Sequence, residues 1–510
     1  MLGLVPSASL LGVDGHAVIV EVHVSSGLPS FSVVGSPDAA CREACGRVRA
    51  ALLSSGCEWP MQRITVNLAP PTVRKIGSGL DLAIAVAILV ASAQVTAEAV
   101  EGRAFLGELG LDGSVRGVPG VLCLAEAIDS GSLVVAAAST AEATLVGHRR
   151  VHPVATLAEV VACLKGEQPW PDAAPVEGTP PPAPLPDLAD VRGQPVARYA
   201  LEVAAAGGHH LLMLGPPGAG KTMLAARLPG LLPPLTDEEA LETTRIHSAA
   251  GLGVPAGGLV RHPPFRAPHH GASAVALIGG GSSTLRPGEI SAATNGVLFL
   301  DELAEFATHV LDGLRQPLEE GVVRVARAAA TVQFPARFLL VAAMNPCPCG
   351  YGGRPGGCRC TDAARARYQR RLSGPLVDRF DLRVEVARPS VPELLGHGDV
   401  PGEPTAAVRA RVLAAREVAA ARGVRCNAAI PTTALDDLAP LSSDATDVLG
   451  AALRSGRLSA RGLHRVRRVG RTVADLQGDA GPLTAAHAAL ALSLRIDAGA
   501  VITPGAPLSA

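Results

Sequence analysis

A glycine-rich octapeptide near the middle of the chain has the residue types and spacing needed to bind a chain of phosphates. It fits the pattern G-x4-G-K-[ST] and consists of Gly215, Pro216, Pro217, Gly218, Ala219, Gly220, Lys221 and Thr222. The glycines allow backbone N–H groups to converge on phosphate oxygens, and a helix that starts here adds positive potential. We expect Lys221 to reach the β- and γ-phosphates of ATP and the Thr222 hydroxyl to bind Mg²⁺.

Two more polar segments follow apolar stretches that are typical of buried strands. Residues 297–300 are followed by Asp301 and Glu302, and residues 338–344 lead to Asn345. Because the carboxyl ends of parallel strands meet at one edge of a sheet, these side chains should lie beside the phosphate loop. The pattern predicts that Asp301 holds Mg²⁺, that Glu302 orients or deprotonates the attacking water, and that Asn345 hydrogen-bonds the γ-phosphate or that water.

Cysteines are concentrated in the segment that follows Asn345. Four of the ten form two Cys-x-Cys pairs with eight residues between them: Cys347, Cys349, Cys358 and Cys360. Four thiolates could hold Zn²⁺ tetrahedrally, although this spacing is unusual for a zinc knuckle. A reduced glycine- and proline-rich loop and a redox switch are the alternatives. The other cysteines are scattered among aliphatic residues, which is typical of small buried side chains in a reducing compartment.

The composition indicates a large aliphatic protein without a strong overall charge. The 510 residues suggest about two to four domains of roughly 150 residues each. Apolar residues form 48% of the chain, aromatic residues only 3%, and the formal net charge is −1, so any nucleic-acid binding must come from a local patch. The longest apolar run, from Leu82, spans about twelve residues, whereas a membrane helix needs about twenty. Since the start of the chain lacks the basic region of a secretory signal, we expect a cytoplasmic protein without a membrane partner.

The chain divides at a proline-rich segment. Residues 167–187 contain eight prolines, which predicts a semi-rigid linker. Residues 1–166 mix apolar strands with helices, residues 188–392 alternate strands and helices, and residues 404–500 are mostly helical. The predicted fold class is therefore α/β, with an N-terminal α/β domain, a central phosphate-loop domain built on a parallel sheet, and a C-terminal helical lid domain.

The three motifs at the strand ends together resemble those of the AAA+ ATPases, ring-forming machines that act on polymers or partner proteins. In that family a neighbouring subunit donates an arginine to the nucleotide. The resemblance places Arg379, in LSGPLVDRFDL, at that arginine finger, with Arg371 as a rival, and Arg461, in LSARGLHRVRR, at the second sensor of the lid. It also implies that Val191 and Gly193 contact the adenine.

Longer segments are similar to the magnesium-chelatase-like AAA+ proteins, and in particular to the ComM/YifB family. They include PFRAPHHGASAVALIGGG, PGEISAATNGVLFLDELAEF and SGPLVDRFDLRVEV, and the resemblance covers nearly the whole chain. It implies a homo-hexameric motor that uses ATP to drive branch migration of branched or single-stranded DNA during recombination in natural transformation. The alternatives are a chelatase-like ATPase that remodels a protein partner for metal insertion, and a regulator that uses ATP as a switch. Chelatase motor subunits usually lack an N-terminal domain of this kind.

The N-terminal domain is similar to the C-terminal, S5-like domain of Lon protease, which raises the question of peptidase activity. In Lon the nucleophilic serine lies in a loop of the type K-D-G-P-S-A-G. The corresponding segment here is RKIGSGLDL, with Lys75, Ser78 and Asp81; Ser78 is one position away from the nucleophile, and Gly79 occupies that position. Because a serine nucleophile needs a lysine amine within hydrogen-bond reach, we expect a scaffold or DNA-contacting role instead.

An arginine-rich segment of the C-terminal domain is a candidate for binding DNA. Residues 454–471 hold seven arginines and no acid. On a helix, Arg461, Arg465 and Arg468 share one face, which could neutralise phosphates. A solvated or intersubunit face is the alternative.

Two other segments are candidates for contacts with DNA or with a neighbouring subunit. The family resemblance places a hairpin within residues 314–334, whose Arg324 and Arg327 would contact DNA in the pore. Residues 266–270 (RAPHH) include two adjacent histidines, which cannot share one helical face and have no cysteine or carboxylate at ligand spacing. We therefore interpret RAPHH as an inserted loop that contacts DNA or the next subunit, and not as a metal site.

Overall fold

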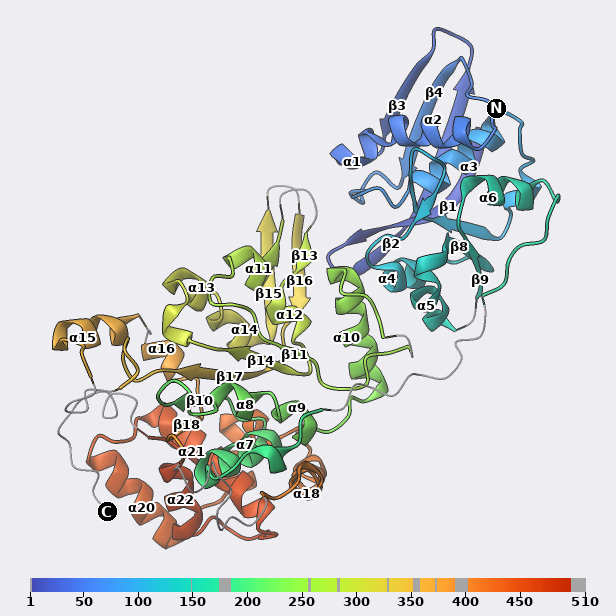
Figure 1. Ribbon diagram of the computed structural model, residues 1–510. Helices are drawn as coiled ribbons and strands as arrows, with labels where there is room; N and C mark the ends of the chain where they lie inside the picture. Colours follow the sequence, from blue (N-terminus) through green and yellow to red (C-terminus); the bar gives the residue numbers. More distant parts are fainter. Residues whose placement is uncertain are drawn as a thin grey trace.

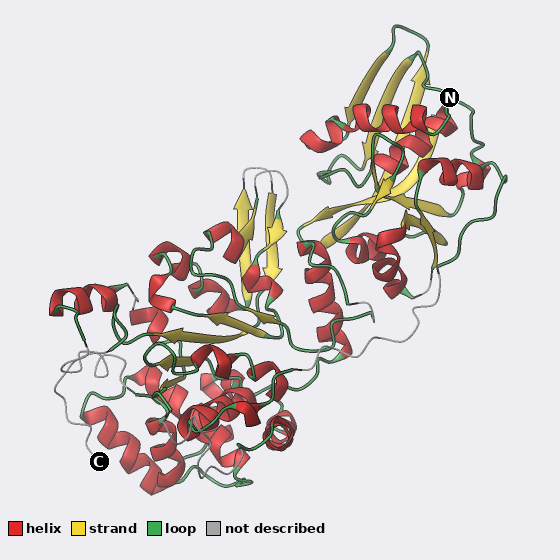
Figure 2. Ribbon diagram, viewed as in Figure 1, coloured by secondary structure: helices red, strands yellow, loops and turns green. Residues whose placement is uncertain are grey.

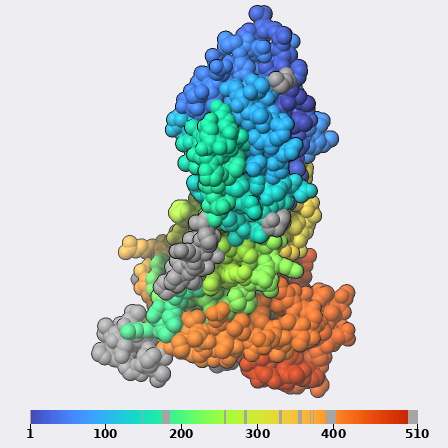
Figure 3. Space-filling model, turned by 90° about the vertical axis from the view of Figure 1, so that its right-hand side faces the viewer, coloured from blue at the N-terminus to red at the C-terminus, as the bar shows by residue number. Residues whose placement is uncertain are grey.

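The molecule is elongated, with three regions that follow one another along the chain (Figure 1, Figure 3). The structure is a computed structural model that describes residues 2–147, 149–173, 185–255, 258–281, 285–327, 330–351, 358–371, 374–389 and 402–496. The middle of the predicted proline-rich linker, residues 174–184, lies outside the described residues. Within the described ranges, no helix is long and apolar enough to cross a membrane.

The N-terminal region is a mixed α/β structure with two main sheets. Its strands and helices are β1 (Leu2–Leu11), β2 (Asp14–Ser25), β3 (Ser30–Val34), α1 (Ala39–Arg42), α2 (Ala44–Ser54), β4 (Arg63–Ala69), α3 (Asp81–Ala91), β5 (Arg103–Leu106), β6 (Glu108–Leu109), β7 (Val115–Arg116), α4 (Val121–Ala127), β8 (Ser132–Ala136), α5 (Thr140–Ala143), β9 (Arg150–Val154) and α6 (Leu157–Leu164). One sheet has the order β1-β2-β4-β3 and the other is the parallel sheet β5-β8-β9. The apolar run predicted to be a buried helix is α3, and every residue of α3 is buried.

The central region is built on a five-stranded sheet with the order β11-β14-β17-β10-β18. All four neighbouring pairs in this sheet are parallel, and helices lie on both of its sides (Figure 2). The elements of this region are α7 (Pro195–Gly207), β10 (Leu211–Leu214), α8 (Lys221–Ala225), α9 (Leu228–Leu231), α10 (Asp237–Ala250), β11 (Phe265–Arg266), α11 (Ala274–Ile278), β12 (Gly279–Gly280), β13 (Arg286–Pro287), α12 (Glu289–Ala292), β14 (Val297–Leu300), α13 (Thr308–Asp312), α14 (Arg315–Glu320), β15 (Val322–Arg327), β16 (Ala330–Pro335), β17 (Leu339–Met344), α15 (Asp362–Arg370), α16 (Gly374–Val377) and β18 (Leu382–Glu385).

The three inner strands of the central sheet are apolar throughout. Every residue of β10, β14 and β17 is buried, as expected for parallel strands covered on both faces. Because these strands run in the same direction, the segments that follow them leave the sheet at a common edge. This arrangement brings together the phosphate loop after β10, the acidic pair after β14 and Asn345 after β17.

The C-terminal region is helical and packs against the central region beside α7 (Figure 1). It contains α18 (Thr405–Ala421), α19 (Leu435–Leu438), α20 (Ser443–Arg454), α21 (Ala460–Leu476) and α22 (Ala485–Ser493). The Ser459 side chain caps α21 by accepting a hydrogen bond from the Gly462 N–H. One face of α21 is apolar, and its Val466, Val469 and Val473 join the same core as β10 and α7.

The N-terminal region contacts the central region through α10. The Gly120 N–H donates to the Ser248 carbonyl (2.9 Å), and the Ser248 hydroxyl donates to the Glu142 carboxylate (2.7 Å). Arg245, also on α10, pairs with Glu126 at 3.1 Å. These polar contacts tie the two regions together on one side of α10.

A second contact involves the β15–β16 hairpin, which projects toward the N-terminal region (Figure 1). Val13, in the turn between β1 and β2, is buried in the same apolar cluster as Val332 of the hairpin. The hairpin predicted from the family resemblance therefore exists, and its strand β16 packs against the N-terminal region through Val332. Arg324 is exposed and pairs with Glu320, whereas the side chain of Arg327 lies outside the described residues.

Candidate nucleotide-binding site

The phosphate loop connects β10 to α8 and curves around a lysine. Gly218 and Gly220 have φ values of 76° and 88°, a left-handed conformation in which glycine carries no steric penalty. The Lys221 amine donates to the carbonyls of Gly215 (2.6 Å) and Pro216 (3.0 Å) and to Oδ1 of Asn345 (3.1 Å). Burial lowers the pKa of Lys221, and the negative charges of Asp301 and Glu302 partly oppose this shift. The lysine is thus enclosed by the loop and by the end of β17.

Thr222 and Asp301 lie side by side at the mouth of this loop. The Thr222 hydroxyl donates to Oδ2 of Asp301 at 2.6 Å, and Oδ1 of Asp301 accepts from the Glu302 N–H at 2.9 Å. A hydroxyl and a carboxylate at this spacing provide the hard oxygen ligands that Mg²⁺ prefers, with room left for water and phosphate oxygens. The donor set therefore fits the ion predicted for these two residues.

A cavity of about 450 Å³ joins these groups. The residues that line it are Pro217, Gly218, Ala219, Gly220, Lys221, Thr222, Met223, Asp301, Glu302, Met344 and Asn345. The structure thus brings together the predicted phosphate-binding, magnesium-binding and water-activating side chains around a single space. Val191, by contrast, is completely buried and presents no surface to a ligand.

Glu302 has a partner that its sequence motif does not predict. Its carboxylate lies 2.9 Å from Nδ1 of His270, and its backbone has a φ of 51°, an uncommon left-handed conformation for a non-glycine residue. The His270 ring is 4.0 Å from the His269 ring, centroid to centroid, and contacts Phe306 edge-on. The RAPHH segment, interpreted as a loop for DNA or for the next subunit, therefore lies against the Glu302 carboxylate of its own chain.

No periodic pattern in the sequence marks the position of His270. His270 follows β11, which pairs with β14, so the segment after β11 must lie beside the segment that carries Glu302. Since β11 comprises only Phe265 and Arg266, the sequence does not predict a strand there.

We expect His270→Ala to lower the kcat of ATP hydrolysis about tenfold, because a displaced carboxylate no longer holds the attacking water in line. Steady-state turnover at saturating ATP measures this effect. His269→Ala is the matched control, because its ring lies tilted against that of His270 whereas His270 makes the ion pair with Glu302, and it should cost less than about threefold. Equal rates for the parent and His270→Ala would show that the histidine does not orient Glu302.

Neither predicted arginine lines this cavity. Arg379 is 9% exposed; its side chain donates to the Pro375 carbonyl (2.8 Å) and pairs with Glu319 on α14. Arg461 is exposed at the start of α21. A role in trans for Arg379 requires a second copy of the chain and stays a prediction.

Arg371, the rival finger, is held close to the acidic pair of its own chain. Its guanidinium donates to the Ala304 carbonyl (3.1 Å) and pairs with Glu305 (2.8 Å). Arg371 also borders a second cavity that contains His270 and His309. As for Arg379, a role of Arg371 in trans requires a second copy of the chain and stays a prediction.

On the predicted phosphate-binding face of α21, two of the three arginines have partners within the chain. Arg465 pairs with the buried Asp381, and Arg468 donates to the Ile430 carbonyl (2.8 Å) and to Thr432 (3.2 Å). Helical spacing identified a shared face correctly, but acceptors distant in the sequence cover it. Only Arg461 of the three is exposed.

The four cysteines after β17 converge, although residues 352–357 between them lie outside the described residues. Their sulfur atoms all lie within 4.8 Å of one another. The separation is 3.4 Å between Cys347 and Cys349, 3.8 Å between Cys347 and Cys358, and 3.5 Å between Cys349 and Cys358. A tetrahedral zinc with Zn–S bonds of about 2.3 Å requires S–S separations of about 3.8 Å. The donor set and its spacing therefore fit zinc.

In the N-terminal region, the residues at the Lon-like motif have other partners. The Ser78 hydroxyl donates to Glu108, and the fully buried Lys75 donates to the Pro70 carbonyl. Asp81 is buried and pairs with Arg47 at 2.6 Å. Ser78 and Lys75 thus contact other groups and do not form a serine–lysine pair with each other, and Asp81 is paired with an arginine.

Comparison with known protein families covers all three regions. Residues 187–394 match the model described as "Magnesium chelatase, subunit ChlI", residues 20–139 match "Subunit ChlI of Mg-chelatase", and residues 402–495 match "Magnesium chelatase, subunit ChlI C-terminal". The model that matches the N-terminal region is also described as a chelatase subunit. The presence of this region therefore does not by itself distinguish a chelatase-like function from that of a DNA motor.

Curated relatives match along nearly their whole length. The chain is 45% identical to competence protein ComM of Haemophilus influenzae, covering 94% of each protein. It is 44% identical to YifB of Escherichia coli, covering 97% of each, and 47% identical to an uncharacterised protein of Mycobacterium tuberculosis, covering 94% of this chain and 96% of that one. These matches confirm the resemblance predicted from the motifs.

Proposed function

The chain belongs to the magnesium-chelatase-like family of AAA+ ATPases that includes ComM and YifB, and we propose that it is a hexameric, ATP-driven motor that moves branched DNA. The observation that carries the ATPase part of this proposal is the convergence of Lys221, Thr222 and Asp301 with Glu302 and Asn345 around one cavity. The DNA part is supported by the full-length similarity to a protein named for competence.

Five side chains of the cavity have proposed roles that their positions support. Lys221 exchanges its contacts with the loop carbonyls for the β- and γ-phosphate oxygens. Thr222 and Asp301 hold Mg²⁺, which neutralises charge on the phosphates when it is bound. Glu302 orients or deprotonates the attacking water, and Asn345 hydrogen-bonds the γ-phosphate from the end of β17.

The remaining roles belong to residues outside the cavity, and that of Arg379 requires the assembled ring. Arg379 leaves Glu319 and reaches the γ-phosphate bound by an adjoining protomer, where its charge stabilises the transition state. Arg461 senses the nucleotide of its own chain from the lid. The N-terminal region serves as a scaffold or DNA contact, beside the β15–β16 hairpin that it touches.

ATPase turnover in the presence of different DNA structures tests the motor. Forked, four-way and linear DNA are compared with no DNA, and strand displacement is measured beside Glu302→Gln. We expect branched DNA to raise turnover and the variant to lose displacement while it retains ATP binding. The motor is excluded if no DNA raises turnover and Glu302→Gln displaces strands as well as the parent does.

The family-model descriptions favour one other candidate, an ATPase that remodels a chelatase-like protein partner. Such a protein would hydrolyse ATP at a rate that DNA does not change and that a porphyrin-binding subunit raises. A regulator that uses ATP only as a switch would keep its activity with Glu302→Gln. The same turnover assay therefore separates the three functions.

We further propose that Cys347, Cys349, Cys358 and Cys360 hold a structural zinc ion that orders the segment after β17. We expect elemental analysis of the purified chain to find about one zinc per chain and Cys349→Ser to lose it, with a lower thermal midpoint because the bound metal stabilises the ordered loop. Cys45→Ser, a half-buried cysteine outside the cluster, is the control and should retain the metal. A metal-free parent protein, or equal zinc in both variants, would refute the site.

A further inference from the structure

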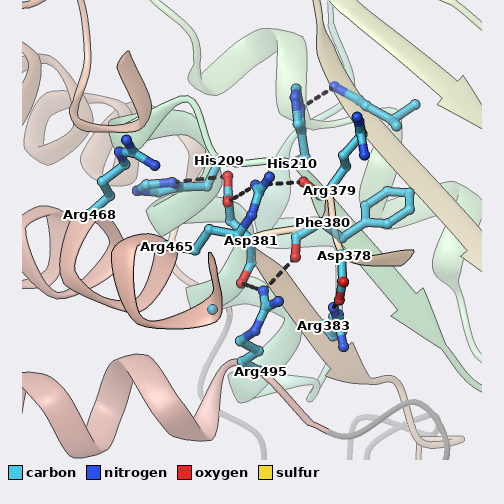
Figure 4. A network of polar contacts seen from close by, with 12 residues as sticks. His209, His210, Asp378, Arg379, Phe380, Asp381, Arg383, Arg465, Arg468 and Arg495 are labelled. Carbon is cyan, nitrogen blue, oxygen red and sulfur yellow. Dashed lines mark hydrogen bonds and ion pairs between the residues drawn. The ribbon is translucent and has the colours of Figure 1, made fainter. Parts of the chain in front are cut away.

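Three consecutive carbonyls beside the proposed arginine finger accept hydrogen bonds from the lid (Figure 4). Nη1 of Arg465, on α21, donates to the Arg379 carbonyl at 3.0 Å. Nη1 of Arg495, just after α22, donates to the carbonyls of Phe380 (2.6 Å) and Asp381 (3.1 Å). The backbone that carries Arg379 is therefore attached to the C-terminal region, although β18, which follows it, belongs to the central sheet.

The carboxylate of Asp381 strengthens this attachment from the inside. Asp381 is 6% exposed; it pairs with Arg465 and lies 3.4 Å from Nδ1 of His209, whose Nε2 contacts the Thr472 hydroxyl of α21 at 2.8 Å. Burial alone would raise the pKa of the Asp381 carboxyl, but His209 and Arg465 hold it far below its usual range. The carboxylate thus stays ionised and maintains its ion pair with Arg465 of the lid.

The Arg379 side chain is held by a different part of the molecule. Its guanidinium contacts Glu319 and the Pro375 carbonyl, both of the central region. The backbone carbonyl of this residue is therefore held by the lid, while its N–H, which donates to the Leu376 carbonyl (3.0 Å), and its guanidinium contact the ATPase core. A shift of α21 relative to the core would change the direction in which the guanidinium points.

The same helix carries the proposed nucleotide sensor. Arg461 and Arg465 lie four residues apart on α21, which is about one helical turn. If α21 moves with the nucleotide state of its own chain, Arg465 moves with it. The hydrogen bond from Arg465 to the Arg379 carbonyl then transmits this movement to Arg379. This connection requires no flexible element between the two arginines.

We propose that Arg465 is a positioning residue that couples the lid, set by the nucleotide of its own chain, to the arginine finger that this chain offers to its neighbour. The inference rests on the proposed function, because it takes Arg379 to act in trans. It assigns Arg465 a role in the hydrolysis that occurs in the adjoining protomer.

Subunit mixing distinguishes this role from a structural one. Arg465→Met should lower kcat about 10- to 100-fold, as expected for a misplaced catalytic group, with a nearly unchanged KM because Lys221 and Thr222 are intact. Arg465→Met is then mixed with an equal amount of Glu302→Gln, which cannot hydrolyse ATP but has an intact arginine finger. In a head-to-tail ring, about half of the Arg465→Met sites face a Glu302→Gln neighbour. The average rate of the Arg465→Met sites should therefore rise to roughly half the parent rate. If the mixture shows no recovery, Arg465 does not act through the finger.

Two controls keep the outcome interpretable. The ATP turnover of Arg379→Ala must also recover in a mixture with Glu302→Gln. If it does not, Arg379 does not act in trans, and the proposed function fails whatever the result for Arg465. Arg468→Met removes comparable hydrogen bonds from α21 within the lid, and whatever activity it loses should not recover.

A conservative variant covers the case in which Arg465→Met does not assemble. Arg465→Lys retains a cation for Asp381, but its shorter side chain does not bring the amine to the position of Nη1, which contacts both Asp381 and the Arg379 carbonyl. It should assemble, lose less activity than Arg465→Met, and recover in the mixture with Glu302→Gln. A full parent rate for Arg465→Lys alone, or a loss that does not recover, would overturn the proposal.

Discussion

Arg379→Ala should lower the kcat of ATP hydrolysis by about 10³-fold or more, the range typical of a lost arginine finger. The guanidinium stabilises the charge of the transition state, whereas ATP binding depends on the phosphate loop of the other chain, so the KM for ATP should change little. Steady-state turnover measures the effect, and sedimentation of the same sample establishes that the assembly is intact.

The rival arginine provides the comparison for this experiment. Arg371 is bound to the Ala304 carbonyl and Glu305 of its own chain, so Arg371→Ala should cost less than about tenfold, through a local shift near the acidic pair. If Arg371→Ala loses the larger factor and Arg379→Ala the smaller one, the finger has been assigned to the wrong residue.

Glu302→Gln should abolish most turnover while leaving nucleotide affinity intact. Loss of a general base typically costs about 10²- to 10⁴-fold, and glutamine has nearly the same shape, so the left-handed backbone at this position is not disturbed. Binding of a fluorescent ATP analogue and turnover are measured on the same preparation.

Lys221→Ala is the contrasting variant, because it removes a charge from the phosphates in the ground state as well as in the transition state. It should lose both binding and turnover. The assignment of Glu302 fails if Glu302→Gln hydrolyses ATP at the parent rate, or if it loses nucleotide affinity as severely as Lys221→Ala does.

Much of the cavity could be predicted because it depends on local patterns. Apolar strands that end in Lys221–Thr222, Asp301–Glu302 and Asn345 must meet at one edge if the sheet is parallel, and the structure has such a sheet. The order of the strands was not needed for this argument. Buried parallel strands are continuous apolar runs, so their ends can be located in the sequence.

The parts that escaped prediction depend on contacts between distant segments. His270 reaches Glu302 because a two-residue strand places it there, and two residues are too few to show a period. The arginines of α21 were correctly placed on one face, but helical spacing contains no information on acceptors such as Asp381, which is 84 positions from Arg465. The packing of the β1–β2 turn on the hairpin is of the same long-range kind.

The central claim is that the ATP held by one chain is cleaved only with the arginine of another. Turnover per chain, measured across protein concentrations at which the assembly dissociates and followed by sedimentation in the same buffer, tests it most directly. The account predicts that turnover per chain falls as the assembly dissociates. In the monomer it should be about a thousandth of its value in the assembly. A monomeric chain that hydrolyses ATP as fast as the assembled one would contradict it.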